Sequence, residues 1–273
     1  GYDNIKSSFN YSSIMQFAND EESTIFSLKH HLSSIGFHQS YNNSLEELEE
    51  VKLFGKKPIS VMNPSSERMN TLRTTLHLGL LKNLDFNFRN GSSNTLIYEY
   101  GTIFEGESKK LESIIQNSSL SCLVHGDLFS KNVHFDSISA SFAFLKGVAL
   151  NIFEDKKLNM NIKFLEEKHH YCDPYFSILD GKKQKIGGIG VVNKALLNKL
   201  DIAHKHEVVV LDIDPSTFID YRNFKIKVND VVPYPAVSRD LNFKMDSSIS
   251  VGDVVTAMKT VNQSILQLSL IHI

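Results

Sequence analysis

Two short stretches of the chain carry residue types that could act on a phosphate group. The first, residues 125–132, reads His-Gly-Asp-Leu-Phe-Ser-Lys-Asn. At this spacing, Asp127 could accept a hydroxyl proton and Asn132 could hold Mg²⁺ while a phosphoryl group is transferred. The second, residues 187–190, reads Gly-Gly-Ile-Gly and precedes a helical pattern. Glycines in that position can bring backbone N–H groups close to a nucleotide.

The surroundings of the first stretch do not complete a phosphotransfer site. Its pattern is similar to the catalytic loop of aminoglycoside and choline kinase-like phosphotransferases, and we keep that class as the alternative function. A kinase also needs a glycine-rich loop before the motif and a second metal-binding aspartate after it. No glycine-rich loop precedes His125, and residues 141–147 contain no aspartate. A short motif without its context is a weak signal, so we interpret it as a chance match in a surface loop.

The glycine stretch also lacks the residues that a nucleotide site needs. A dinucleotide-binding turn has a GxGxxG pattern with an acidic residue about 20 positions later, and a Walker loop continues with lysine and serine or threonine. Here Val191, Val192 and Asn193 follow the glycines. We therefore expect the glycines to permit close packing of the backbone in a sheet.

Possible metal ligands fail on spacing. Residues 169–173 include two adjacent histidines, a cysteine and an aspartate, which is not a familiar zinc-binding pattern. His30 and His31 are adjacent on a predicted helix, so they point to different faces. The two cysteines, Cys122 and Cys172, have neither CxxC nor disulfide spacing, which is typical of a reducing compartment.

Length and composition favour a soluble globular protein. The 273 residues are 41% hydrophobic, which is enough for a sizeable core in one or two domains. The net charge of −2 argues against a protein that is basic overall, so contact with nucleic acid would need a local patch. No apolar run approaches the length of a membrane span, and no secretory signal is visible. We expect a cytoplasmic protein that contacts no membrane.

Periodic apolar residues predict the elements of the first hundred positions. One helix is expected over residues 22–35. A second apolar stripe predicts another helix, with Thr74 or Thr75 as its cap and Asn90-Gly91 as its end. That stripe consists of Leu72, Leu76, Leu80, Leu81 and Leu84. Residues 94–104 favour a buried strand. The acidic residues 46–50 are expected to form the solvated face of a helix.

Later segments alternate between strands and helices. We expect a strand at residues 162–164, a hairpin over residues 175–192 with an Asp180-Gly181 turn, a helix over residues 193–200, a strand over residues 207–213 and a short helix from Asp214. A strand with Leu241, Phe243 and Met245 facing inward, a helix from Val251 and a strand at residues 266–270 would make a β-α-β unit. Such a unit is half of a ferredoxin-like fold.

An ordered series of motifs carries a family resemblance. The series consists of Asn63-Pro64, Leu72-Arg73-Thr74, Tyr98-Glu99-Tyr100-Gly101 with Phe104, and Phe142 through Gly147. With this series the chain resembles the β subunit of bacterial-type phenylalanyl-tRNA synthetases over nearly its whole length. The resemblance implies a catalytic-like module of the class II synthetase fold, an antiparallel or mixed sheet flanked by helices, without an active site. Leu78 stands where the family usually has proline.

The most specific motif is Pro-Ala-Val-Ser-Arg-Asp-Leu at residues 235–241. It resembles the opening of the family's C-terminal ferredoxin-like anticodon-binding domain, although Ser238 replaces a frequent arginine. The implied organisation is a tail of a preceding domain and linker over residues 1–20, the non-catalytic module over residues 21–228, and a truncated ferredoxin-like domain over residues 229–273. We expect the truncation to leave an unpaired sheet edge.

The family resemblance also implies a function. Members form an assembly of two α and two β chains that attaches phenylalanine to tRNA(Phe) with ATP and Mg²⁺, and catalysis belongs to the α subunit. This segment would have no catalytic residue and would bind no metal or cofactor. A class II synthetase binds ATP with arginine side chains, and no arginine occurs between Arg89 and Arg222. The editing domain and the family's acidic Mg²⁺-binding residues would lie N-terminal to the segment.

Four residues are candidates for contact with tRNA. Arg239, Lys244 and Lys227 belong to a modest local excess of positive charge, which is compatible with phosphate contacts. Tyr234 could stack on a base. Arg239 could instead pair with Asp240 within the fold, and Tyr234 could pack at the junction of two domains. A free-standing RNA-binding module is therefore a further alternative.

Overall fold

The described part of the chain falls into two units. The computed structural model describes residues 21–106, 111–155, 162–220, 237, 239, 241–242, 244–246, 249 and 251–261. Its contacts divide the chain into Gly1–Lys225 and Ile226–Ile273. Every strand assigned in the described residues belongs to the first unit, which therefore holds the sheet on which a site could be built.

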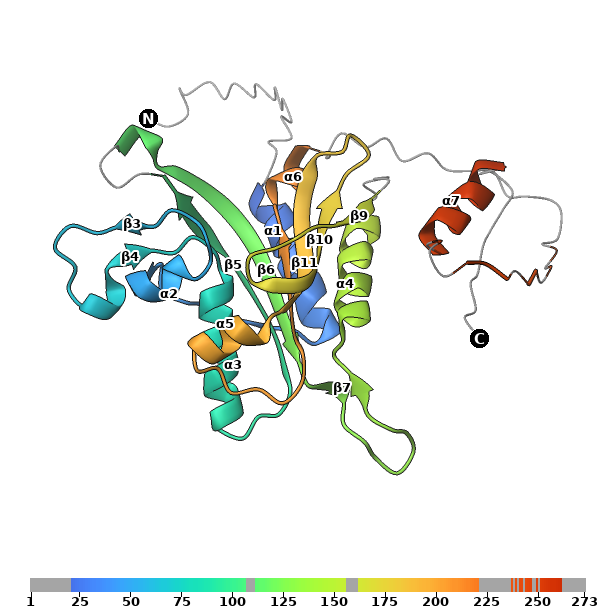
Figure 1. Cartoon of the computed structure of the whole chain (residues 1–273), viewed down its shortest axis with the longest axis horizontal. Coiled ribbons are helices and arrows are strands. Elements are labelled where there is room, and N and C mark those ends of the chain that lie inside the picture. Colours follow the sequence, from blue (N-terminus) through green and yellow to red (C-terminus); the bar gives the residue numbers. More distant parts are fainter. Residues whose placement is uncertain are drawn as a thin grey trace, which may run out of the picture. The chain divides into compact units, whose positions relative to one another are not determined.

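A seven-stranded mixed sheet is the centre of the first unit (Figure 1). In spatial order its strands are β1 (His38–Gln39), β5 (Thr95–Glu105), β6 (Ile115–His125), β12 (Val208–Ile213), β11 (Lys185–Val192), β10 (Cys172–Leu179) and β9 (Lys163–Glu166). The pair β1–β5 is parallel, and every other neighbouring pair is antiparallel. The unit is therefore of the mixed α+β class, as the sequence predicted.

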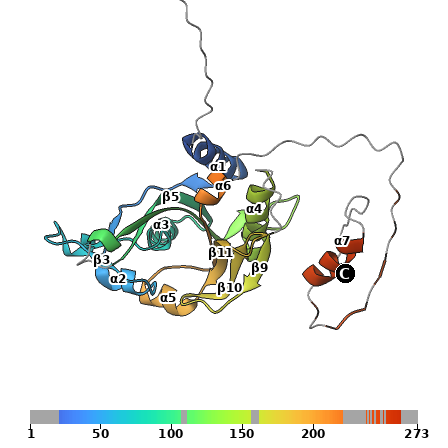
Figure 2. The same ribbon diagram turned by 90° about the horizontal axis from the view of Figure 1, so that it is seen from above.

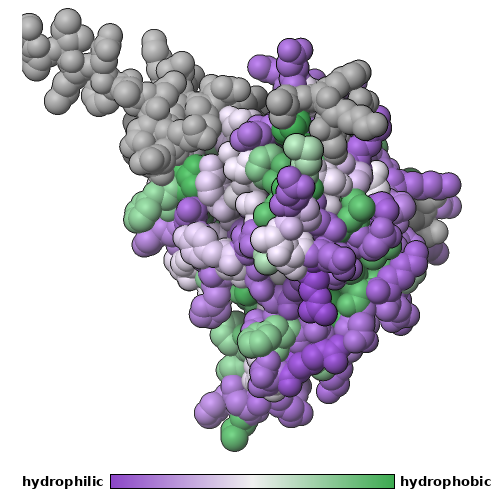
Figure 3. All heavy atoms as spheres, turned by 90° about the vertical axis from the view of Figure 1, so that its left-hand side faces the viewer, coloured by the Kyte–Doolittle hydropathy of each residue, from purple (hydrophilic) through white to green (hydrophobic). Residues whose placement is uncertain are grey.

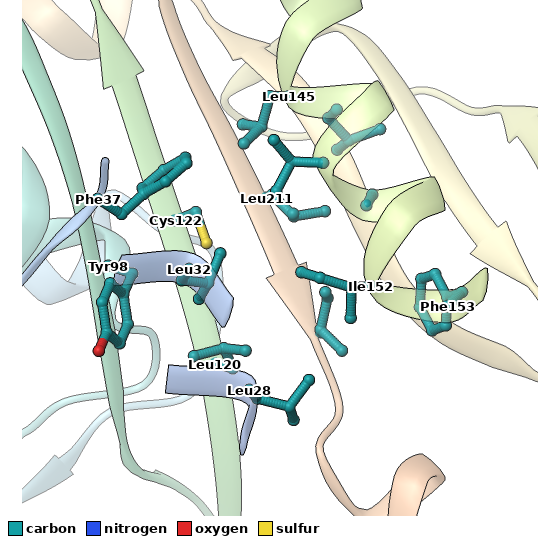
Figure 4. Close-up of a cluster of buried hydrophobic side chains, with 14 of the residues drawn as sticks. Leu28, Leu32, Phe37, Tyr98, Leu120, Cys122, Leu145, Ile152, Phe153 and Leu211 are labelled. Carbon is teal, nitrogen blue, oxygen red and sulfur yellow. The ribbon is translucent and has the colours of Figure 1, made fainter. Parts of the chain in front are cut away.

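One face of the sheet is covered by α1 (Glu21–Ile35), α4 (Phe142–Asp155) and α6 (Ser216–Asp220) (Figure 2). Helix α1 buries apolar residues three to four positions apart, which is the spacing of one helical face. The buried side chains in Figure 4 include Leu28 and Leu32 of α1, Leu145, Ile152 and Phe153 of α4, and Leu120, Cys122 and Leu211 of the strands. They form the larger of the two apolar cores.

The opposite face carries α2 (Leu48–Lys52), α3 (His77–Arg89) and α5 (Lys194–Lys199). Four leucines of α3 are fully buried against strand residues Ile97, Leu123 and Val210. These leucines are Leu78, Leu80, Leu81 and Leu84. The second core therefore binds α3 to the middle of the sheet, at the end where β5 begins and β6 finishes.

Helix α3 begins later than the sequence predicted. Thr71–Leu72 forms strand β4, which pairs with β2 (Leu45–Glu46) on one side and β3 (Ile59–Ser60) on the other. Leu72 is therefore a strand residue, because it pairs with Leu45 of β2 and Ile59 of β3 in this small sheet. Leu76 is the N-cap of α3 and makes no side-chain cap bond, although the backbone N–H of His77 donates to Thr75 Oγ1 at 3.2 Å. A 3₁₀ helix, η2 (Glu67–Met69), precedes β4.

The prediction that residues 46–50 form a solvated helix face is wrong at its first residue. Glu46 is the last residue of β2 and is only 6% exposed. Helix α2 begins at Leu48, and Glu49 is exposed on it, as predicted. Glu46 pairs with Thr71 of β4 in the small sheet, and an acidic run in the sequence does not reveal that pairing.

Other predicted elements are confirmed with small shifts. Helix α1 matches its prediction to within a residue, and Gly91 ends the turn after α3 with a positive φ of 91°. The predicted hairpin is β10–β11, whose turn is closed by Asp180 Oδ1 accepting from the N–H groups of Lys182 and Gln184. Asn193 caps α5 by accepting from the N–H of Leu196.

A two-stranded hairpin extends from the sheet after β6. It consists of β7 (Asp127–Phe129) and β8 (Ile138–Ser139), and it lies at the bottom of Figure 1. Its exposed apolar side chains are Phe129, Val133, Phe135 and Ile138. A 3₁₀ helix, η3 (Leu111–Ser113), precedes β6 at the other end of the sheet.

In the second unit, helix α7 (Val251–Val261) is the one regular element among the described residues. The sequence predicted this helix. It also predicted a preceding strand, but Leu241 and Met245 lie in no strand and are exposed. The inward face predicted for them is therefore absent. A strand is stable only beside a partner, and the predicted partner at residues 266–270, like Phe243, lies outside the described residues.

The surface in Figure 3 carries both hydrophobic and hydrophilic residues. On the face in Figure 3, hydrophobic residues drawn in colour form separate small groups among hydrophilic ones. None of the helices in the described residues has the length and apolar character to cross a membrane.

Candidate functional site

A row of polar and small residues crosses the sheet on the face that carries α3. The strand registers align one residue from each of β10, β11, β12, β6 and β5. These residues are Ser177, Gly188, Asp212, Ser121 and Glu99. Side chains alternate between faces along a strand, so this polar row lies just beyond the apolar residues that α3 covers.

Glu99 forms a buried ion pair with Arg73. Arg73 Nη1 lies 2.6 Å from Glu99 Oε1, and the two side chains are 6% and 3% exposed. Arg73 Nε also donates to the carbonyl oxygen of Thr102 at 2.8 Å, and Asn42 Nδ2 donates to Glu99 Oε2 at 2.6 Å. Gly101 leaves room for the guanidinium, because a Cβ there would overlap it. The guanidinium of Arg73 is thus paired with Glu99 and hydrogen-bonded to the backbone inside the fold.

Asp212 is the second acid of the polar row, and its side chain is 35% exposed. Ser121 Oγ donates to its Oδ1. His77 Nε2 lies 3.0 Å from Oδ2, off the line of a hydrogen bond, so this is an electrostatic contact. Burial alone would raise the pKa of Asp212, but attraction to His77 and the hydrogen bond from Ser121 hold the pKa below its ordinary value.

His77 connects Asp212 to the aromatic residues above the sheet. Its Nδ1 lies 2.8 Å from the hydroxyl of Tyr171, and both residues are buried. Burial raises the pKa of Tyr171 well above its ordinary value, so the phenol keeps its proton. Tyr171, His77 and Asp212 therefore form a continuous polar chain from α3 to the sheet.

A pocket of about 390 Å³ opens beside Asp212, and we call it the Asp212 pocket. Aromatic side chains form one wall: the rings of His169 and Tyr175 stack with centroids 4.0 Å apart. The lining also includes Phe54, Lys56, Thr74, Thr75, Ile103, Asn117, Ser119, Tyr171, Lys185, Gly187, Gly188 and Asp214. Burial, and then the neighbouring His77 and Lys185, lower the pKa of His169 to about 4, so its ring is neutral at pH 7.

The glycines of β11 give the Asp212 pocket its shape. A Cβ on Gly188 would overlap the hydroxyl of Tyr175, and a Cβ on Gly187 would overlap the carbonyl oxygen of Asp212. Tyr175 can therefore lie flat over the strand. This confirms the expectation that the glycine stretch permits close packing in a sheet.

The kinase-like stretch is built into the fold in a different way from that predicted. His125 ends β6 and is completely buried, so it is not in a surface loop. Its Nε2 accepts from the N–H groups of Lys205 and His206, both at 3.2 Å. Asn132 Oδ1 accepts from the N–H of His134 at 2.7 Å, which holds the hairpin turn. These contacts give His125 and Asn132 structural roles.

Among the described residues, no group of three or more His, Cys, Asp and Glu side chains is arranged to hold a metal ion, and this includes residues 169–173. Both cysteines are buried and free. Arg239 and Lys244 are exposed in the second unit, and Lys227 and Tyr234 lie outside the described residues.

Sequence reasoning missed the polar row and the residues that complete it. Asp212 follows Val208 and Val210 at spacings of two, so alternation places all three on one face of β12. That pattern signals an acid on a buried face. Arg73 and His77 gave a weaker signal, as polar residues between leucines. Their partners come from strands far along the chain, which a local pattern does not reveal.

Comparison with protein families gives one match, which covers most of the chain. A family model described as the phenylalanyl tRNA synthetase beta chain CLM domain matches residues 7–214. This interval includes the whole seven-stranded sheet and every residue that lines the Asp212 pocket. The last of these lining residues, Asp214, is also the last residue of the match.

Individual relatives agree with the family model. The phenylalanine–tRNA ligase beta subunit of Francisella tularensis is 27% identical over 241 residues, covering 85% of this chain and 28% of that protein. The corresponding subunit of Nitratidesulfovibrio vulgaris is 24% identical over 233 residues, covering 84% of this chain and 29% of that protein. The chain thus spans less than a third of the length of these relatives. None of these comparisons supports a kinase.

A solved structure shares the fold. The pyrrolysyl-tRNA synthetase of Desulfitobacterium hafniense superposes with a TM-score of 0.57 at 15% identity, covering 74% of this chain and 69% of that one. At this identity the likeness concerns the fold alone. The arrangement of one mixed sheet between two helical layers is therefore one that a tRNA synthetase also uses.

Proposed function

Because this chain belongs to the phenylalanyl-tRNA synthetase β-chain family, we propose that it serves as a non-catalytic part of a phenylalanine–tRNA ligase. The observation that carries the proposal is the family match over residues 7–214, which includes the whole sheet and all of its flanking helices except α6. The whole enzyme would attach phenylalanine to tRNA(Phe) with ATP and Mg²⁺ in the cytoplasm. Since the chain spans 28% of the Francisella relative, this activity belongs to a larger assembly.

The absence of an available arginine supports a non-catalytic role. A triphosphate is best held by the flat, permanently charged fork of arginine. The described residues that line the Asp212 pocket include no arginine, and the nearby Arg73 is held by Glu99 and the Thr102 carbonyl. The module would therefore contribute by docking on an α subunit, within an assembly of two α and two β chains, and would bind neither ATP nor Mg²⁺ itself.

The second unit would contribute to tRNA binding. In this proposal residues 21–228 are the class II synthetase-like module and residues 229–273 are the first half of a ferredoxin-like anticodon-binding domain. Helix α7 would be the helix of its β-α-β unit. The exposed Arg239 and Lys244, with Lys227 and Tyr234, would contact the tRNA.

Coexpression with a phenylalanyl-tRNA synthetase α chain tests the proposal. We expect the two chains to copurify, because the β-chain module is proposed to dock on α. We also expect phenylalanine-dependent pyrophosphate exchange from the pair and none from this chain alone. Failure to copurify, or exchange by the isolated chain, would contradict the proposal.

A further inference from the structure

We propose that the Asp212 pocket binds a small molecule through a primary ammonium group that donates to Asp212, with the rest of the molecule against Tyr171 and Tyr175. This inference goes beyond the proposed function and does not depend on it. It rests on the charge of Asp212, on an unpartnered hydroxyl in the pocket and on the shape of its aromatic wall.

The other charged groups of the pocket already have partners. Lys56 Nζ lies 3.8 Å from Glu105, and Lys185 Nζ lies 3.9 Å from Glu167. Asp214 Oδ1 accepts from both the backbone N–H and the hydroxyl of Ser216. The side chain of Asp212 accepts from Ser121 Oγ, so among the described residues it is the acid of the pocket that keeps an oxygen free of hydrogen bonds next to the aromatic wall.

The contact with His77 leaves acceptor positions of Asp212 open. His77 Nε2 lies 3.0 Å from Asp212 Oδ2 without forming a hydrogen bond, and its Nδ1 lies 2.8 Å from the Tyr171 hydroxyl. A carboxylate offers about four acceptor positions, and the ammonium group would take one that faces the pocket.

A buried hydroxyl in the same pocket also lacks a partner. Thr74 lines the pocket, is 1% exposed, and its Oγ1 has no hydrogen-bond partner among the described residues. An unsatisfied buried hydroxyl is costly, because it has lost its water without a replacement. A polar atom of a bound molecule would satisfy it. Thr74 thus indicates a ligand independently of Asp212.

The aromatic wall suits a cation with an apolar body. Lys185 Nζ already lies 5.2 Å from the centre of the Tyr175 ring, which shows that this ring accepts a positive charge. Phe54 and Tyr171 extend the wall in an edge-to-face pair with centroids 4.8 Å apart. The volume of about 390 Å³ lies in the range of small-molecule sites.

Titration with benzylamine tests the proposal on the full chain. At pH 7 benzylamine carries an ammonium group next to an aromatic ring, and benzyl alcohol has a similar shape without the charge. We expect benzylamine to shift NMR signals of the pocket residues and to bind roughly ten- to a hundredfold more tightly than benzyl alcohol, because hydrogen bonds to charged groups are the stronger ones.

Two variants place the binding in the Asp212 pocket. Asp212→Asn keeps the shape of the side chain and should weaken benzylamine binding by roughly tenfold or more. Asn117→Trp should block the pocket without changing its polar chain, because Asn117 is an exposed lining residue. The matched control is Gln116→Trp, since Gln116 is exposed on the opposite face of the same strand. A second control, Asp136→Asn, removes an exposed acid of the β7–β8 hairpin.

The outcomes are decisive in either direction. Loss of binding in Asp212→Asn and Asn117→Trp, with binding unchanged in both controls, would support the proposal. It would be overturned if benzylamine did not bind, if it bound no better than benzyl alcohol, or if Asn117→Trp bound it as well as the unaltered chain. The last variant keeps the test valid if Asp212→Asn does not fold.

Discussion

Glu46 shows how burial changes the chemistry of one residue. Its side chain is 6% exposed, and its Oε2 has no hydrogen-bond partner among the described residues. Burial raises its pKa to about 8, although attraction to Lys82 and Arg73 opposes the rise. The folded chain therefore keeps a proton that the unfolded chain loses above pH 4.5, and stability falls as pH rises from 4.5 through 8.

Glu46→Gln should remove this pH dependence. Glutamine resembles the protonated acid, so the variant should match the unaltered chain at pH 5 and exceed it at pH 8 by on the order of 3 kcal/mol in free energy of unfolding. Urea unfolding at both pH values measures this. Glu49→Gln, at an exposed position, should change little at either pH. A variant less stable than the unaltered chain at pH 8 would show that Glu46 is ionised and paired.

His125 should make stability fall on the acid side. Burial, and then the neighbouring His206 and His204, lower its pKa to about 4. Between pH 6.5 and 4 the unfolded chain takes up a proton there and the folded chain does not, so stability is full above pH 6.5 and declines as pH falls towards 4. Glutamine can still accept from the N–H groups of Lys205 and His206.

The variant His125→Gln should therefore reduce the slope of unfolding free energy against pH in this interval by about one proton. Unfolding in urea at several pH values between 4.5 and 7 gives the slope. His134→Gln, at an exposed histidine, is the matched control and should leave it unchanged. An unaltered slope in His125→Gln would mean that the folded chain protonates His125 in place.

At the scale of elements, the Arg73–Glu99 pair joins the end of β4 to β5. Arg73→Met should cost about 3–5 kcal/mol of unfolding free energy, because it leaves Glu99 as a buried, unpaired charge. Arg73→Lys should rescue little, since lysine cannot reach both Glu99 and the Thr102 carbonyl with a planar fork. Chemical denaturation measures both. Arg68→Met, at an exposed position, should stay within about 0.5 kcal/mol. Tolerance of Arg73→Met would contradict the role of the pair.

The elements that the sequence predicted well are those with a long periodic pattern. Helix α1 and the β10–β11 hairpin follow from local residues, because a helical stripe and an Asp-Gly turn are both local signals. The start of α3 was misplaced because β4 is two residues long and is defined by partners at Leu45 and Ile59. Short strands of this kind depend on distant pairing.

The same reason separates the predicted from the unpredicted parts of the candidate site. The packing role of the glycines could be derived from their strand context. The Asp212 pocket could not, because its polar chain combines residues of α3 and β12 with Tyr171, which precedes β10, and these residues lie up to 135 positions apart. Sequence patterns locate such residues on a face but do not say which faces meet.

At the scale of the whole molecule, the proposed function includes tRNA binding by exposed basic residues of the second unit. Arg239→Ala with Lys244→Ala should weaken binding of tRNA(Phe) by the α–β complex, and should reduce the slope of log affinity against log salt by about 1 to 2. Filter binding at several salt concentrations measures both quantities. Lys199→Ala, an exposed lysine of the first unit, is the matched control. Unchanged affinity and slope in the double variant would exclude phosphate contacts by these two residues.

The charged residues of β9, one of the two edge strands of the sheet, have a practical consequence. β9 contributes Lys163 and Glu166 at the open border next to β10, and both side chains are exposed. Charges along such a border discourage another copy from adding its own strand there. Concentrated solutions of this protein should therefore resist forming fibrils through that border, and replacing both residues by valine should create a seed for ordered aggregates.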